Sequence, residues 1–293
     1  MFDVLEPFVE FAFMRRALFG CWLLCLSSAP VGVFMVLRRI SLTGDALSHA
    51  ILPGVSAGYL LAGYSVVAMA SGGLVAGALV ALITAWSSRR TRAPKDRNLA
   101  AFYLTSLALG VFMVSIYGSS VDLMHLLFGA ALGMTDAALI WIAGTATITL
   151  WTLLLLIRPL VLDSVDSACL QHGRLGNLAE TSLMLLIVLN LVAGLHAMGS
   201  LMAVGLMILP ATIASHWCQR LESYLLSAIL LGAAACTLGL LGSFYADWPT
   251  SPTILLCLGS VFLFSQLFGR HRSLLGNRLR AWLRSHPSKE IHS

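Results

Sequence analysis

The chain has 293 residues, of which 58% are hydrophobic and 11% charged, with a mean hydropathy of +0.88. Soluble domains carry about 25% charged residues, so this composition excludes a soluble protein and indicates a polytopic membrane protein. The apolar runs are continuous rather than alternating, which excludes a transmembrane β-barrel, and a net charge of +5 does not indicate a nucleic-acid partner.

Nine apolar runs are each long enough to cross the hydrocarbon core of a bilayer as a helix. They lie at 13–37, 43–62, 66–87, 99–117, 135–157, 179–197, 199–217, 222–244 and 253–269. The stretch 118–134 is apolar but short, and it is predicted to be a re-entrant or interfacial segment. We therefore expect an all-α bundle of about eight or nine spans that forms one transmembrane domain, residues 1–293.

Lysine and arginine residues set the expected orientation, because they are enriched in cytoplasmic loops. Five of them lie between Arg89 and Arg97, and six lie in a basic tail, residues 270–293. Placing both clusters in the cytoplasm predicts an odd number of spans, with the N-terminus outside and the C-terminus inside. Arg15 and Arg16 then fall outside, where their side chains can snorkel to the membrane interface.

An ionisable pair lies inside the second predicted span. Asp45 and His49 are four residues apart, so a helix places them on one face. Pro53 cannot donate the backbone hydrogen bond that would satisfy the His49 carbonyl, and it is expected to kink the helix. Ionisable residues inside a span are costly to insert and indicate a pathway or a binding site. An imidazole and a carboxylate suit Zn²⁺, Mn²⁺ or Fe²⁺.

Two side chains are too few to hold a metal ion, so other segments are expected to contribute. Asp247, at the outer end of the eighth predicted span, is a candidate ligand. His196 and His125 are weaker candidates, and a structural role is favoured for His196. No GxxxxGK[ST], HExxH or GxSxG motif is present, so neither ATP binding through a P-loop nor intramembrane hydrolysis has a supporting motif.

A polar cytoplasmic loop is predicted at residues 158–178. It interrupts the apolar chain between the fifth and sixth predicted spans. A connection between two helices needs only a few residues, so this length favours a short helix across the inner face that serves as a docking surface.

The segment Val36–Gly54, which reads VLRRISLTGDALSHAILPG, closely resembles the signature of the permease subunits of bacterial zinc and manganese ABC importers. An acidic residue commonly follows a Phe-Gly motif in that family, whereas here Ala130 follows Phe128 and Gly129. Three segments in all extend the resemblance over almost the entire chain: 121–129, 199–212 and 247–253.

The resemblance implies a homodimer in the bacterial inner (plasma) membrane, with the transport pathway between the two copies. Two cytoplasmic ATPase subunits would bind ATP and drive transport, and an extracytoplasmic binding protein would deliver the metal. Asp45 and His49 match positions at which family members coordinate metal. A coupling helix that contacts the ATPase would map to about residues 163–174, and Pro210 would kink the later core helix. The candidate ATPase contacts are Asp166, Ala168 and Gly173.

The predicted function is import of Zn²⁺ or Mn²⁺ by a permease that is not itself an enzyme and holds no permanent cofactor. Zinc is slightly favoured by its affinity for an imidazole ligand. A permease for iron chelates or cobalamin is one alternative, although such large cargoes do not require an Asp–His pair. A stand-alone ion-coupled transporter is another, although the sequence shows no convincing internal repeat.

Overall fold

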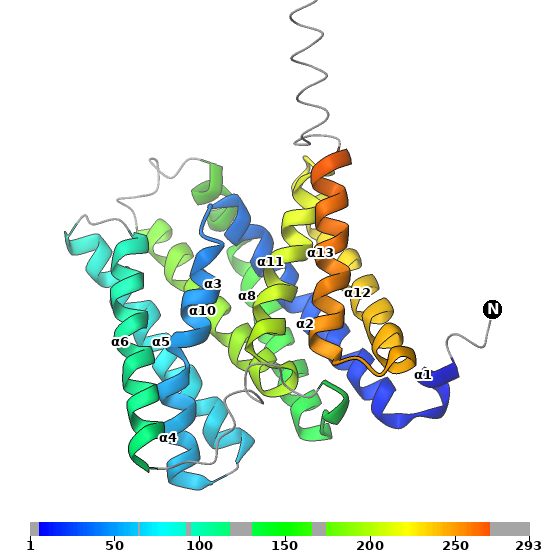
Figure 1. Cartoon of the computed structure of the whole chain (residues 1–293). Helices are drawn as coiled ribbons and strands as arrows, with labels where there is room; N and C mark the ends of the chain where they lie inside the picture. Colours follow the sequence, from blue (N-terminus) through cyan, green and yellow to red (C-terminus); the bar gives the residue numbers. More distant parts are fainter. Residues whose placement is uncertain (1–5, 64, 92–94, 118–130, 166–173, 270–293) are drawn as a thin grey trace, which may run out of the picture.

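The computed structural model describes residues 6–63, 65–91, 95–117, 131–165 and 174–269, and the regular structure in these ranges is helical, as predicted (Figure 1). Within these ranges, six helices are long and apolar enough to cross a membrane: α2 (Ala12–Leu37), α5 (Val66–Thr91), α8 (Asp136–Val165), α10 (Arg174–Met198), α12 (Leu221–Ala246) and α13 (Thr250–Phe268). The remaining elements are α1 (Glu6–Glu10), α3 (Leu42–Ala50), α4 (Leu52–Ala62), α6 (Lys95–Tyr117), the 3-10 helix η2 (Ala131–Gly133) and α11 (Ser200–Ser215).

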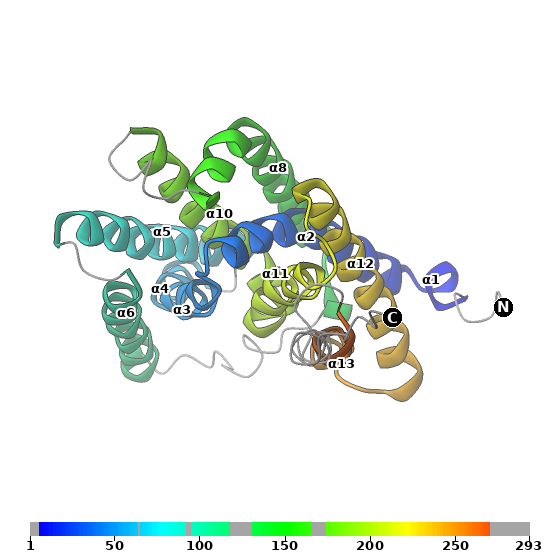
Figure 2. The same ribbon diagram turned by 90° about the horizontal axis from the view of Figure 1, so that it is seen from above.

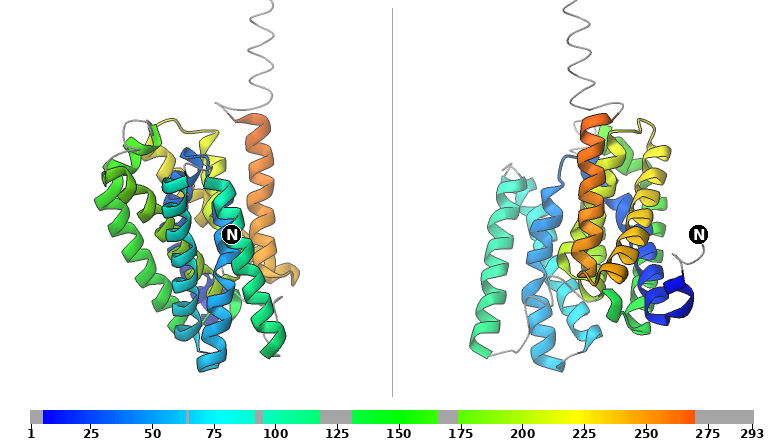
Figure 3. Two further views of the ribbon diagram at one scale, coloured as in Figure 1. Left: turned by 90° about the vertical axis from the view of Figure 1, so that its left-hand side faces the viewer. Right: turned by 45° about the vertical axis from the view of Figure 1, so that its right-hand side comes forward.

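The helices run alternately up and down, so the bundle has two ends (Figures 1 and 3). The upper end in Figure 1 holds the turn from α2 to α3 and the last residues of α8 and α13, and it is called the Arg38 end below. The lower end holds the start of α8 and the turn between α12 and α13, and it is called the Asp136 end. Seen from above, α2, α10 and α11 lie in the middle (Figure 2), and α2 and α10 are the most buried of the six long helices.

The second predicted span, 43–62, is two helices rather than one. α3 ends at Ala50 and α4 begins at Leu52, so the break falls at Ile51, two residues before Pro53. The Gly54 and Val55 N–H groups both donate to the Ile51 carbonyl, at 3.1 and 3.2 Å. Because proline has no N–H to donate, the hydrogen-bond ladder of α3 cannot continue unchanged into α4.

The helices on either side of the predicted loop 158–178 extend into it. α8 continues to Val165 and α10 begins at Arg174. Some of the charged residues that indicated a loop, such as Arg158, are therefore helical. Residues 166–173 lie outside the described part of the chain, as do the basic tail 270–293 and most of the short segment 118–134. The candidate ATPase contacts are therefore not described: Asp166, Ala168 and Gly173.

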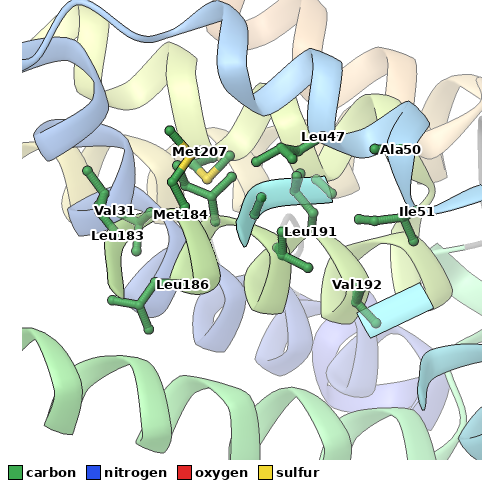
Figure 4. Close-up of a cluster of buried hydrophobic side chains, with 14 of the residues drawn as sticks. Val31, Leu47, Ala50, Ile51, Leu183, Met184, Leu186, Leu191, Val192 and Met207 are labelled. Carbon is green, nitrogen blue, oxygen red and sulfur yellow. The ribbon is translucent and has the colours of Figure 1, made fainter. Parts of the chain in front are cut away.

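One face of α3 is anchored in a buried apolar cluster (Figure 4). Leu47 and Ile51 lie over α10, where Leu191 belongs to the same cluster, and Met207 of α11 lies beside Leu47. Burying large apolar side chains of this kind stabilises a fold by about 1.5–3 kcal/mol each. This cluster fixes which side of α3 faces the protein.

Glycines hold α4 and α5 in direct backbone contact. A Cβ atom added to Gly54 would collide with the carbonyl oxygen of Gly72, and one added to Gly58 would collide with the carbonyl oxygen of Ala68. Small residues spaced by four allow membrane helices to approach this closely. α4 therefore has no room for a side chain on the face toward α5.

Gly54→Ala is expected to lower the free energy of unfolding by about 1–3 kcal/mol, because the new methyl group overpacks the α4–α5 contact. Gly144→Ala is the matched control, since a Cβ there meets no atom within 4 Å. The control should be neutral or more stable by up to about 1 kcal/mol, since alanine favours a helix over glycine. Unfolding of the purified protein in mixed micelles, followed by circular dichroism, measures both. Equal stability of the two variants would contradict this packing.

Candidate metal site

Asp45 and His49 lie on the open face of α3. The opposite face contains Leu47 and Ala50, which are fully buried. On the open face Leu42 is 84% exposed, and the side chains of Asp45 and His49 are 66% and 36% exposed. The helical period places these three residues on one face, and His49 lies about one turn after Asp45. The two side chains are thus available to a ligand or to a partner chain on this side of α3, because they do not pack into the apolar core.

The two side chains already lie near the spacing of metal ligands. The Nε2 atom of His49 is 3.9 Å from the Oδ1 atom of Asp45. Metal–ligand bonds of about 2.0–2.2 Å place two ligand atoms about 2.8–3.6 Å apart in an octahedral or tetrahedral site. A small rotation of either side chain brings both atoms to that spacing. The pair can therefore supply two ligands to one divalent cation from one helical turn.

Helix α6 supports the break beside this pair. The Gly54 N–H bonds to the Ile51 carbonyl, so it is not available to the Ala50 carbonyl as in a regular helix. The Ser106 hydroxyl of α6 donates to the Ala50 carbonyl instead, at 2.9 Å. A Cβ atom at Gly110 would lie 3.0 Å from the nitrogen of Pro53, so glycine lets α6 pack directly on the break.

Sequence reasoning noted the His49 carbonyl but missed the role of α6. The signal that could have revealed it is the spacing of Ser106 and Gly110. These residues are four apart, so a small hydroxyl residue and a glycine share one face of an otherwise apolar helix.

Asp247 is not brought to the pair within one chain. It follows α12 as its C-cap in a left-handed conformation, with φ of 51°, and lies at the Asp136 end, whereas α3 begins at the Arg38 end (Figure 1). Across the described ranges, no three His, Cys, Asp or Glu side chains are arranged to hold a metal ion. His125 and the side chain of His196 lie outside what the structure describes.

The segment after Asp247 has a structural role. The buried Ser251 hydroxyl donates to the Met198 carbonyl at 2.9 Å, where α10 gives way to α11 through Gly199 with φ of 87°. This bond ties the start of α13 to the α10–α11 turn at the Asp136 end. The segment that resembles the family's last outer loop thus holds three helices together.

Pro210 lies within α11, which runs as one helix from Ser200 to Ser215. Proline leaves the Leu206 carbonyl without its helical N–H partner. The Pro210 ring is buried beside α12, where a Cβ atom at Gly232 would lie 3.4 Å from its Cγ. The close approach of α12 at Gly232 accommodates this ring.

Comparison with known proteins gives consistent matches over nearly the whole chain. The family model described as the ABC 3 transport family matches residues 10–269. The chain is 30% identical over 264 residues to the manganese import system permease protein ScaB of Streptococcus parasanguinis, covering 90% of this chain and 93% of ScaB. It is 29% identical over 281 residues to the chelated iron transport system membrane protein YfeD of Yersinia pestis, covering 94% of this chain and 91% of YfeD. Among solved structures it is similar to PsaBC from Streptococcus pneumoniae in complex with Fab, with a TM-score of 0.80, 28% identity, and coverage of 96% and 99%.

Asp45→Asn and His49→Gln are each expected to weaken binding of Mn²⁺ and Zn²⁺ by at least about 100-fold, since even indirect supporting residues of metal sites contribute 10–100-fold. Both substitutions keep the side-chain size and remove a ligand charge or ring nitrogen. Isothermal titration of the purified protein with each metal measures the effect. Asp247→Asn is the control, and it should leave binding unchanged because the bundle separates it from the pair. A loss in Asp247→Asn equal to that in Asp45→Asn would place Asp247 in the same site.

Proposed function

The chain belongs to the ABC 3 transport family, and on this premise we propose that its cargo is a free divalent transition-metal ion that passes Asp45 and His49. The protein is the membrane permease of an ABC metal importer and a non-catalytic component of it. The observation on which the proposal rests is the open face of α3, where a carboxylate and an imidazole lie 3.9 Å apart. A pair of this kind is costly inside a span unless it serves a pathway.

The ligand chemistry favours manganese, zinc or ferrous iron over calcium and magnesium. Calcium and magnesium prefer oxygen ligands alone, whereas His49 supplies nitrogen. The affinity order of divalent metals favours zinc slightly. Names of relatives point to manganese and to chelated iron. We therefore take Mn²⁺ as the first cargo to test, with Zn²⁺ second and Fe²⁺ third.

A second copy of the chain would supply the ligands that the pair lacks. Zinc takes four ligands and manganese more, whereas one chain supplies two side chains. Two copies related by a two-fold axis, with their α3 faces toward each other, would supply Asp45 and His49 twice. The exposed Leu42 would then contribute apolar contact beside the metal. This arrangement places the pathway between the copies.

The direction of transport follows from the expected topology. The charge distribution favours a cytoplasmic Arg38 end and an external Asp136 end. In this orientation two ATPase subunits dock around residues 166–173, and a binding protein delivers metal to the opposite end. The few residues between the Arg38 end and α3 favour a position of the pair in the inner half of the membrane or near its middle. ATP is hydrolysed by the partner subunits.

Asp45→Ala and His49→Ala are each expected to abolish ATP-driven Mn²⁺ or Zn²⁺ uptake into cells that express the complete importer, because each removes a ligand from the pathway. Co-purification with the ATPase should be unchanged, since both side chains lie on the open face of α3 and outside the segment expected to contact the ATPase. Radioactive or fluorescent metal accumulation measures uptake. Uptake driven by a proton gradient without the ATPase would favour a stand-alone transporter. Normal uptake by both variants would remove the pair from the pathway.

Leu42→Cys is expected to form a disulfide between two copies on mild oxidation, because the residue shares the open face with the metal pair. Leu155→Cys on α8 is the matched control, since it is 73% exposed but lies across the bundle from α3 (Figure 2). Non-reducing gel electrophoresis of membranes shows the cross-linked dimer, with the unsubstituted chain as the blank. Cross-linking at Leu155→Cys instead would move the dimer face to α8.

A further inference from the structure

A largely buried ion pair connects the turn before α3 to the last turn of α8. The Nη2 atom of Arg38 lies 2.9 Å from the Oδ2 atom of Asp163, and the two side chains are only 9% and 16% exposed. The same guanidinium donates to the Ser164 hydroxyl at 3.4 Å and to the Leu160 carbonyl at 3.5 Å. One arginine thus contacts three acceptors on α8. These directional contacts fix the position of the guanidinium, in addition to the attraction between opposite charges.

The charge of Arg38 is retained in this position. Burial lowers the pKa of Arg38, and the carboxylates of Asp163 and Glu180 oppose that shift. Arginine stays protonated in proteins, so the guanidinium needs a permanent partner here. The contact between α2, α8 and α10 at the Arg38 end therefore depends on charges.

The backbone between Arg38 and α3 is tightly turned. The Arg38 N–H bonds to the Phe34 carbonyl at 3.0 Å, and the Ile40 N–H bonds to the Met35 carbonyl at 3.0 Å. Between them Arg39 adopts a left-handed conformation with φ of 57°. α3 begins at Leu42, so only residues 39–41 separate it from Arg38. These residues are held by backbone hydrogen bonds, so a displacement of Arg38 would also displace α3.

The other half of the pair lies beside the expected ATPase contact. Asp163 is two residues before the end of α8 at Val165, and the segment 166–173 follows directly. Both α2 and α8 end at the Arg38 end of the bundle (Figure 1). The ion pair is therefore a direct polar contact between the end of α8, which leads to the expected ATPase segment, and the turn that leads to α3 and the metal pair.

We propose that Arg38 and Asp163 are a positioning pair that transmits displacement of the α8 end to α3, and thereby moves Asp45 and His49 when the ATPase acts. This inference rests on the proposed function. A guanidinium bound to three acceptors holds two helix ends in one relative position, because a shift of either end breaks these directional bonds. Replacing a buried ion pair by apolar residues commonly leaves a protein folded, so this coupling role can be separated from stability.

The test uses the complete importer in proteoliposomes and measures Mn²⁺ imported per ATP hydrolysed. The double variant Arg38→Met with Asp163→Leu is expected to assemble and to bind Mn²⁺ within about twofold of the wild type. Its ratio of metal to ATP should fall about tenfold or more, because ATP hydrolysis continues while α3 no longer follows it. An assembled double variant with an unchanged ratio would overturn the proposal.

Arg38→Lys covers the case in which the double variant does not assemble. Lysine keeps the charge that Asp163 requires but cannot reach Ser164 and Leu160 in the same geometry. The ratio of metal to ATP should fall about threefold, and an unchanged ratio would also overturn the proposal.

A second ion pair provides the matched control. The Nε atom of Arg16 lies 2.9 Å from the Oδ1 atom of Asp136, in an exposed position at the opposite end of the bundle. Arg16→Met with Asp136→Leu removes a bridge of the same length and should leave the ratio unchanged, and an equal loss there would overturn the assignment to Arg38. The wild-type complex separates the two hypotheses: absence of ATP-driven metal uptake overturns the proposed function, whereas normal wild-type uptake with a fully coupled Arg38 variant overturns only this inference.

Discussion

The backbone hydrogen bonds at Ile51 are the constraint around which this chain is arranged. A membrane interior offers no water to satisfy a free carbonyl, so a helix that breaks there needs a partner from elsewhere in the protein. Ser106 of α6 supplies that partner to the Ala50 carbonyl, and Gly110 lets the same helix lie against Pro53. With the break stabilised from one side, the buried face of α3 packs on α10 and its opposite face stays open.

The helices were largely predictable because hydrocarbon selects for length and apolarity, and both are visible in a sequence. Asp45 and His49 were predictable as a pair because a helix repeats every 3.6 residues. The break at Ile51 was only partly visible: Pro53 indicated a disturbance, but its place depends on contacts from α6. Similarly, α8 extends beyond its predicted end, because a charged residue such as Asp163 remains helical when a distant partner neutralises it.

Contacts between distant segments were not predictable from this one sequence. Arg16 was expected to snorkel to the membrane interface, but its ion pair with Asp136 on another helix was not predicted. Asp247 was a reasonable ligand by chemistry, but alternation of the helices puts it at the opposite end from the start of α3. Hydropathy indicates which segments cross the membrane, and residue types indicate which chemistry is possible. Neither indicates which helices are neighbours. The sequence therefore predicts the two candidate ligands, Asp45 and His49, but not the helices that pack around them.

The glycine contact between α4 and α5 limits how these two helices can move relative to each other. With Gly54 and Gly58 lying directly on backbone carbonyls of α5, these helices have no side-chain layer through which they could slide. α4 and α5 thus form one close-packed unit, and α3 is connected along the chain to α4 through the single residue Ile51. Because the helical hydrogen bonds are interrupted at Ile51, a rotation of α3 relative to α4 would take place at this residue.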